Sequence, residues 1–168
     1  MTQGQPGTPG MWVLLSYRIP RKPSTPRIAI WRKLKRLGIA QLGDGLVALP
    51  ADARTREHLD WIAEEVIEAG GTAGVWVAQP ATLAQEREIA AGMAAARSAE
   101  YRTVIEQAAA AHTFPAAERA RTVRRLRDEL HRIRRRDYFP PAERDTARLA
   151  VETVTAASPD SPVAGAHP

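Results

Sequence analysis

The 168-residue sequence contains no cysteine, and this absence excludes several kinds of chemistry. Disulfide bonds, thiolate zinc sites and cysteine nucleophiles all require a thiol. A chain without disulfides suits a reducing compartment, and the N-terminal residues lack the charged and apolar regions of a signal peptide. No apolar run approaches the roughly 20 residues that a membrane-spanning helix needs. We therefore expect a cytoplasmic protein that makes no membrane contact.

Acidic residues are absent from the first 43 positions, which carry eight basic ones. The balance reverses over residues 44–107, where eleven acidic residues stand against five arginines. It reverses again over Arg119–Arg136, where nine arginines face only Asp128 and Glu129. Two basic blocks thus flank an acidic segment, and such blocks attract polyanions such as nucleic acid.

Apolar residues make up 44% of the chain and charged residues 26%, which is the balance of a globular protein with a core. Glycine, proline and other small residues concentrate at the two ends, so we expect residues 1–10 and 157–168 to be disordered. Between these ends the predicted secondary structure changes once, from alternating strands and helices to helices alone. Residues 11–80 predict an αβ domain, and residues 81–156 predict a helical extension.

The αβ pattern consists of short apolar runs that alternate with helical periodicity. The run Met11–Ile19 is rich in aromatic and β-branched residues and predicts a buried strand. Gly43-Asp44-Gly45 predicts a tight turn between two further strands. The expected strands are 11–19, 39–42, 46–49 and 72–77, and the expected helices are 24–37 and 55–69. This order of elements is the α+β arrangement of the ferredoxin-like, split βαβ fold.

The extension predicts three helices, at residues 83–111, 116–136 and 141–155. In the second of them Val123, Leu126, Leu130 and Ile133 recur at spacings of three and four, which indicates one narrow apolar face. The two helices of a ferredoxin-like domain cover only one face of its sheet, and apolar strands call for a cover on the other. We expect the extension to pack on or beside that second face.

Several motifs resemble the N-terminal domain of the ChrB family. They are Tyr17-x-Ile19-Pro20 at the end of the first strand, Pro26-Arg27 at the start of the helix, Trp31-Arg32-x-Leu34-x-x-Leu37-Gly38 within it, and Leu49-Pro50 at a strand end. The likeness continues to Arg136-Asp137-Tyr138-Phe139 and covers about Trp12 to Val154, with its specific motifs in the first half. The resemblance implies a transcription regulator that responds to chromate.

The αβ part is more distantly similar to the central domain of PaaX-type repressors and to small CRISPR-associated nucleases that dimerise through a ferredoxin-like sheet. PaaX-type repressors place a winged helix before this domain, and here only ten residues precede the first strand. The nucleases hold a metal with an aspartate where this sequence has Ser16-Tyr17-Arg18. The chain ends where the larger second ChrB domain would begin, so chromate sensing by that domain is not carried over, and a separate chain is a candidate to supply it.

The candidate nucleic-acid-binding residues are cations of the two basic blocks. A solvated helix face is the alternative for the first block, where the position of Trp31 favours core packing over stacking. Arginines of the second block suit bidentate phosphate contacts, but they could equally pair with the acidic helix Glu86–Glu106. We expect those nearest the apolar face to pair internally and Arg134–Arg136 to stay free. The candidates are Arg18, Arg21, Lys22, Arg27, Arg32, Lys33, Lys35, Arg36, Arg124, Arg125, Arg134, Arg135 and Arg136.

Catalytic and metal-binding patterns are weak. The four histidines, His58, His112, His131 and His167, lack carboxylate or histidine partners at ligand spacing, and Asp44 between two glycines is typical of a turn. We expect no enzyme activity, no metal and no cofactor. An oxyanion such as chromate is an alternative ligand for Arg18, Arg21, Lys22 and the start of the first helix, where backbone N–H groups point outward.

Three hypotheses follow from these patterns. The favoured one is a DNA-associated regulatory module that forms a homodimer, with the first helix and the arginine-rich helix facing the phosphate backbone. The second is an interaction module without nucleic acid, whose basic blocks meet acidic partner proteins or the acidic segment of the chain itself. The third is an oxyanion-binding or chromate-reducing protein.

Overall fold

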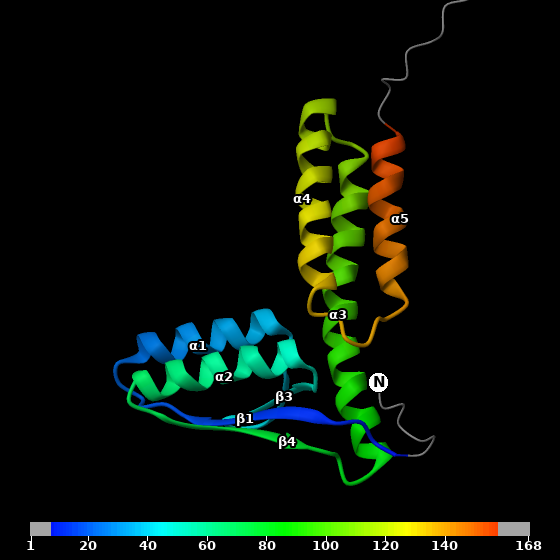
Figure 1. Ribbon diagram of the computed structural model, residues 1–168. Coiled ribbons are helices and arrows are strands. Elements are labelled where there is room, and N and C mark those ends of the chain that lie inside the picture. The colour runs from blue at the N-terminus through cyan, green and yellow to red at the C-terminus, as the bar shows by residue number, and fades with distance from the viewer. Residues whose placement is uncertain (1–7, 158–168) are drawn as a thin grey trace, which may run out of the picture. The chain divides into compact units, whose positions relative to one another are not determined.

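The computed structural model describes residues 8–157, and its helices and strands follow one another in the predicted order (Figure 1). The predicted disorder of residues 1–7 and 158–168 lies outside the described residues. The α+β class is confirmed. The elements are β1 (Trp12–Arg18), α1 (Ser24–Leu37), β2 (Ala40–Gly43), β3 (Leu46–Pro50), α2 (Ala53–Glu68), β4 (Thr72–Ala78), α3 (Leu83–Ala111), α4 (Ala116–Arg134) and α5 (Glu143–Ala156).

Two compact units make up the described chain. The αβ unit comprises the described residues up to Ala95 together with Arg136–Phe139, and the helical unit comprises Ala96–Arg135 and the residues from Pro140 onward. The sequence placed the boundary at residue 80, whereas the units divide inside α3. The reason is that Ile89 and Met93, near the start of α3, pack with the core of the αβ unit.

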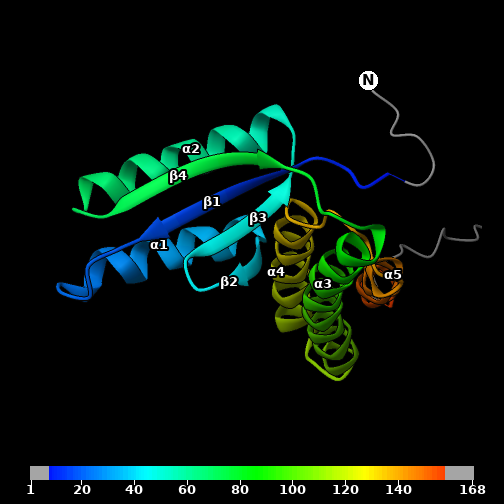
Figure 2. The ribbon, with the colours of Figure 1, turned by 90° about the horizontal axis from the view of Figure 1, so that it is seen from below.

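The four strands form one sheet in the order β2-β3-β1-β4, and every neighbouring pair is antiparallel. Leu15 on β1 lies opposite Val47 on β3 and Val75 on β4. Because side chains alternate along a strand, Val13 and Leu15 share one face of the sheet, and Leu14 and Ser16 share the other. In Figure 2 the helices α1 and α2 lie behind the sheet, and the second face is turned toward the viewer.

The core of the αβ unit lies between the sheet and the helices α1 and α2. Its fully buried side chains include Leu15 from β1, Leu34 from α1, Leu49 from β3 and Leu59 from α2. Burying a leucine contributes about 1.5–3 kcal/mol relative to leaving it exposed, so this layer holds the two helices on the sheet. The helices thereby turn their polar sides outward.

The helix α2 begins two residues earlier than the pattern predicted, because Asp52 caps it. The Asp52 carboxylate accepts a hydrogen bond from the Thr55 backbone N–H (2.7 Å), and the Asp52 N–H donates to the Thr55 hydroxyl oxygen (2.9 Å). This reciprocal capping box satisfies two backbone donors at the helix start.

The turn between β2 and β3 depends on a glycine. Gly45 has a positive φ of 67°, and a Cβ atom there would lie 2.3 Å from the carbonyl oxygen of Tyr17. The Tyr17 backbone N–H donates to the Gly45 carbonyl oxygen (2.8 Å), which ties the turn to the end of β1. A side chain at position 45 is therefore excluded by both conformation and space.

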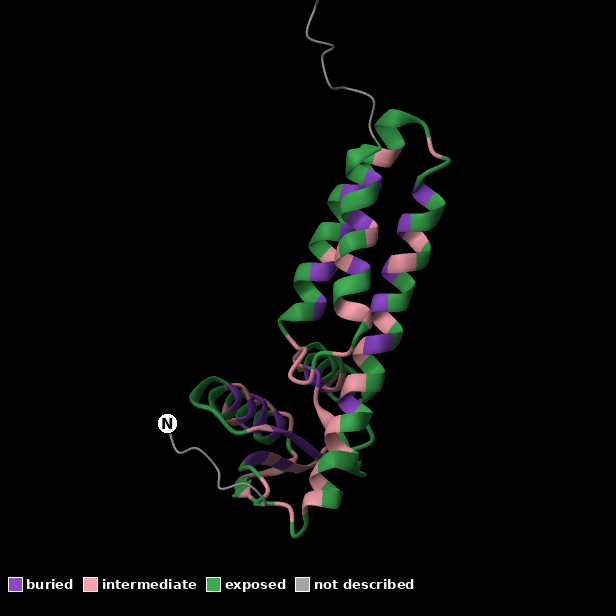
Figure 3. Ribbon diagram, turned by 90° about the vertical axis from the view of Figure 1, so that its right-hand side faces the viewer, coloured by how far each residue is buried: buried purple, intermediate pink, exposed green. Residues whose placement is uncertain are grey.

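The helical unit packs the end of α3 with α4 and α5. All four residues of the predicted apolar face, Val123, Leu126, Leu130 and Ile133, are buried, so that prediction is confirmed. They pack with residues of α3 such as Tyr101 and of α5 such as Val151. Figure 3 shows the buried residues of this unit on the sides of the helices that face one another. Most arginines of α4 are left exposed on the outer side, while Arg119 is partly buried.

Candidate nucleic-acid interface

The first basic surface consists of the eight cations from the end of β1 to the end of α1. All of them are exposed. Because α1 buries Ile30 and Leu34 against the core, its charged residues lie on the remaining sides of the helix. The members are Arg18, Arg21, Lys22, Arg27, Arg32, Lys33, Lys35 and Arg36. The structure thus exposes every predicted cation of the first block.

Two members of this surface are engaged by neighbouring side chains. The Lys33 ammonium lies 2.6 Å from the Glu65 carboxylate, in an exposed ion pair between α1 and α2. The Lys35 ammonium lies 5.1 Å from the ring centroid of Trp31, within the range of a cation–π contact. Trp31 itself is half-buried and packs against the core, as its helical position predicted.

The other six cations make no hydrogen bond or ion pair with any residue between positions 8 and 157. They are Arg18, Arg21, Lys22, Arg27, Arg32 and Arg36. The first turn of α1 also holds no acidic residue. Their charges are therefore not cancelled locally, which is the condition for releasing counterions when a polyanion binds.

A groove of about 560 Å³ adjoins the start of α1. The aromatic rings of Tyr17 and Trp31 line it, and so do the side chains of Arg21, Arg27 and Asp44. Partial burial raises the pKa of the Tyr17 hydroxyl above its ordinary value of 10.0, so this group is a neutral hydrogen-bond donor at physiological pH. The groove combines apolar walls with two arginines and one carboxylate.

The second basic surface consists of Arg124, Arg125 and Arg134 on α4 and of Arg135 directly after it, all of them exposed. Arg125 donates to the side-chain oxygen of Gln107 (2.8 Å), a neutral acceptor that leaves its charge uncancelled. Arg124, Arg134 and Arg135 have no hydrogen-bond or ion-pair partner within the described part of the chain. The predicted freedom of Arg134 and Arg135 therefore agrees with the structure.

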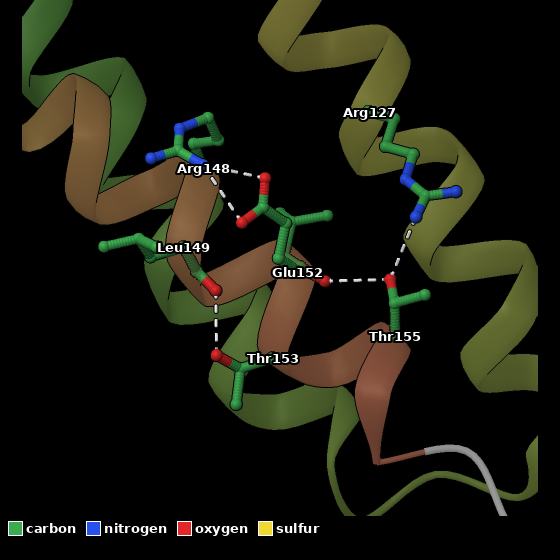
Figure 4. A network of polar contacts seen from close by, with 7 residues as sticks. Arg127, Arg148, Leu149, Glu152, Thr153 and Thr155 are labelled. Carbon is green, nitrogen blue, oxygen red and sulfur yellow. Dashed lines mark hydrogen bonds and ion pairs between the residues drawn. The ribbon is translucent and has the colours of Figure 1, made fainter.

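Other arginines of α4 pair with their neighbours. Arg127 donates to the hydroxyl of Thr155 on α5 (3.1 Å), close to the Arg148–Glu152 ion pair (Figure 4). Arg132 pairs with Glu129 on its own helix (2.7 Å). The alternative in which the arginine-rich helix is latched to the acidic residues of α3 gains little support, because Arg125 and Arg127 bind neutral groups.

Arg136 departs from its prediction. The sequence pattern made it a free cation at the end of the arginine-rich helix, but α4 ends at Arg134, and Arg136 is partly buried and engaged with other groups. The cause is long-range packing, because Arg136–Phe139 belong to the αβ unit. We therefore leave Arg136 out of the second basic surface.

Residues with catalytic potential are dispersed. The part of the chain that the structure describes holds no group of three or more histidine, aspartate or glutamate residues that could bind a metal. His58 lies beside Trp61, His112 and His131 are exposed, and Asp44 lies exposed in the β2–β3 turn. His167 lies outside the described residues. Within residues 8–157 no helix has the length and apolarity that crossing a membrane requires.

The sequence analysis did not identify the two exposed tryptophans of the described residues, Trp61 on α2 and Trp76 on β4. Trp76 lies in the strand that was predicted at residues 72–77, and the residue is 60% exposed. The available signal was Gly74 two positions earlier, because a glycine on the same face leaves room for a large neighbouring ring.

Fold and surface together define a protein with an αβ unit and a helical unit, each of which exposes cations without acidic partners. The family described as "Protein ChrB, N-terminal" matches residues 27–161 of the chain. Protein ChrB of Cupriavidus metallidurans is 32% identical over 133 residues, which cover 77% of this chain and 40% of that relative. The chain therefore belongs to the ChrB N-terminal family.

The residues matched by the family differ from the range over which the sequence motifs resemble ChrB. The matched range begins at Arg27 in α1, so the strand motif at Tyr17 lies before it, and the helical unit lies largely inside it. The aligned residues span about two fifths of the length of the curated relative. No solved structure matches the chain.

Proposed function

We propose that this chain is a DNA-associated regulatory module, acting as a homodimer in a response connected with chromate resistance. One observation carries the proposal. Seven cations of the first basic surface, all but Lys33, and all four of the second are exposed and lack acidic partners among the described residues. Membership in the ChrB family supports the connection with chromate resistance.

The chemistry of the two surfaces fits the phosphate backbone of DNA. Arginine offers a planar set of five donors that matches phosphate oxygens, and most of the unpaired cations are arginines. None of the buried residues of α1 and α4 is a cation, so the basic side chains can reach phosphates without any unfolding of the two helices. Contacts of this type position a protein on DNA but do not read its sequence.

We also propose that the αβ unit has the ferredoxin-like fold. The element order and the strand order β2-β3-β1-β4 support this assignment, because each helix joins two strands that have a third strand between them. The helices α1 and α2 cover one face of such a sheet. On the other face Trp12 is buried at one end, and the part around Trp76 is available for a ligand or a partner.

A second candidate function is oxyanion binding, and the groove beside α1 favours it. Arg21 and Arg27 line this groove together with the Tyr17 ring. Calorimetric titration with chromate and with sulfate tests this candidate directly. Heat of binding that disappears in an R21A/R27A variant would support it, and no heat with either anion would dispose of it.

The DNA proposal is tested by a mobility-shift series on duplex DNA from upstream of the gene that encodes this chain. The apparent affinity is expected to fall steeply between about 50 and 200 mM salt, because binding releases counterions from the phosphates. Affinity that does not change with salt would refute phosphate-backbone binding. Sedimentation velocity of the same sample tests the proposed homodimer.

A further inference from the structure

The exposed residue Trp76 lies on the face of the sheet that α1 and α2 do not cover. Trp76 on β4 is opposite Leu14 on β1, and Gly74 is opposite Ser16. Leu14 and Ser16 alternate with Val13 and Leu15, which are buried against the helices. Trp76 therefore projects from the second face, the one turned toward the viewer in Figure 2.

The indole ring of Trp76 is held in one orientation. Its Nε1–H donates a hydrogen bond to the Ser16 hydroxyl oxygen at 2.9 Å, across to the neighbouring strand. A Cβ atom on Gly74 would lie 3.2 Å from the same Nε1 and 3.5 Å from Cε2, so the ring lies against this glycine. With one side of the ring on the sheet and the residue 60% exposed, the other side faces solvent.

An open groove of about 540 Å³ adjoins the indole ring, and polar and apolar groups contribute about equally to its lining. Arg18 lies on the same face of β1, one alternation beyond Ser16, and has no hydrogen-bond or ion-pair partner among the described residues. Thr72 lies opposite Arg18 and adds a hydroxyl, and Asp44 adds a carboxylate from the β2–β3 turn. The groove thus offers a cation for a phosphate and an acceptor for amino groups.

We propose that Trp76 is a stacking platform for a base of single-stranded nucleic acid, with Arg18 binding the adjacent phosphate. A base stacks on an aromatic ring that is fixed and has one open side. The Ser16 hydrogen bond and the contact with Gly74 fix the Trp76 ring in this way. The side chains of Arg18, Asp44 and Thr72 argue against an apolar protein segment as the occupant, because they would lose their hydration without gaining partners. This site binds a base by stacking. It shares Arg18 with the first basic surface and is otherwise separate from the phosphate contacts proposed for α1 and α4.

The test compares two single strands of equal length and charge, a 12-residue oligo(dT) and an abasic strand. Fluorescence anisotropy at one fixed salt concentration measures both affinities for the full chain. The wild-type protein is expected to bind oligo(dT) at least about tenfold more tightly, as stacking on one aromatic ring allows. Equal affinities for the two strands would overturn the proposal.

Variants of Trp76 separate stacking from simple apolar contact. W76L keeps an apolar side chain but removes the aromatic ring, so the preference for oligo(dT) is expected to disappear. W76F keeps an aromatic ring and is expected to retain most of the preference for oligo(dT). W61L is the matched control, because Trp61 is similarly exposed (56%) but lies on α2. Equal losses in W76L and W61L, or full retention in W76L, would contradict the assignment.

Two further measurements distinguish other causes of a loss. Circular dichroism spectra that match the wild type show that each variant is folded. Sedimentation velocity shows whether W76L alters the association of the chain with itself; a change there without a change in base preference would make this face a subunit contact and overturn the proposal. W76L is expected to bind duplex DNA as tightly as the wild type does. The duplex assay therefore tests the DNA proposal, and the comparison of oligo(dT) with the abasic strand tests the stacking proposal.

Discussion

The rings of Trp12 and Phe139 stack with their centroids 6.0 Å apart and their planes inclined by 21°. Trp12 begins β1, and Phe139 lies in the segment between α4 and α5, so this contact joins distant parts of the sequence. It explains why Arg136–Phe139 belong to the αβ unit although the residues on either side belong to the helical unit. Trp12 is only 3% exposed, because the chain returns to cover it.

Replacing Phe139 by alanine is expected to destabilise the αβ unit by about 1–3 kcal/mol, since it removes an aromatic pair and uncovers Trp12. All four tryptophans lie in the αβ unit, so unfolding by urea followed by tryptophan fluorescence reports on this unit alone. F139L keeps most of the apolar volume and is expected to lose less. Equal stabilities of F139A and the wild type would mean that the stack contributes nothing.

The neighbouring Tyr138 gives a prediction for alkaline pH. Burial raises the pKa of the Tyr138 hydroxyl above 10.0, while the nearby Arg54 guanidinium lowers it by a smaller amount. Stability is therefore independent of this group below pH 10.0 and falls as the pH rises from there through the raised pKa. Y138F is expected to lose less stability than the wild type between pH 9 and about pH 11. Parallel pH profiles of the two proteins would contradict this account.

Lys33 and Arg36 form a matched pair on α1. Both variants, K33A and R36A, remove one positive charge, so the long-range attraction of DNA falls equally. Lys33 is already held by Glu65, whereas Arg36 is free to contact a phosphate. R36A is therefore expected to weaken duplex binding several-fold more than K33A, measured by anisotropy at about 100 mM salt. A larger loss of duplex affinity in K33A than in R36A would mean that the DNA does not contact Arg36. The exposed Lys33–Glu65 pair contributes about 0–1 kcal/mol, so K33A is expected to remain folded.

A similar comparison tests the second basic surface. Arg134 and Arg135 are unpaired among the described residues, whereas Arg132 binds Glu129. R134A and R135A are each expected to weaken duplex binding, and R132A is expected to weaken it less. If neither R134A nor R135A changes the affinity, α4 does not face the DNA. Far-ultraviolet circular dichroism serves as the folding control, because these side chains lie outside the buried face of α4.

Local patterns were enough to predict the elements of the αβ unit and the buried face of α4. Residues such as Leu34 and Leu126 recur at helical spacing, and the Gly43-Asp44-Gly45 turn separates two strands, so each element follows from its own residues. The sequence shows that the first basic block has no acidic residue within its own segment, but it left open whether the block would be exposed or paired, and Lys33 pairs with Glu65 of α2.

The features that could not be predicted from the sequence depend on contacts between residues far apart in the chain. Nothing in Asp137-Tyr138-Phe139 shows that this segment returns to Trp12, and this return places Arg136 in a partly buried position. Likewise, the alternation of β4 shows two faces but not which of them a helix covers, so the sequence did not predict the exposure of Trp76. The division of α3 between two units depends on Ile89 and Met93 meeting the αβ core, which again requires the folded chain.

The central claim is that exposed, unpaired cations on α1 contact DNA phosphates. The most direct test measures how duplex affinity depends on salt for the wild type and for an R27A/R32A/R36A variant. The slope of log K against log salt is expected to decrease by about 0.9 for each phosphate contact that the variant loses. An unchanged slope in a variant that is folded as the wild type would contradict the claim.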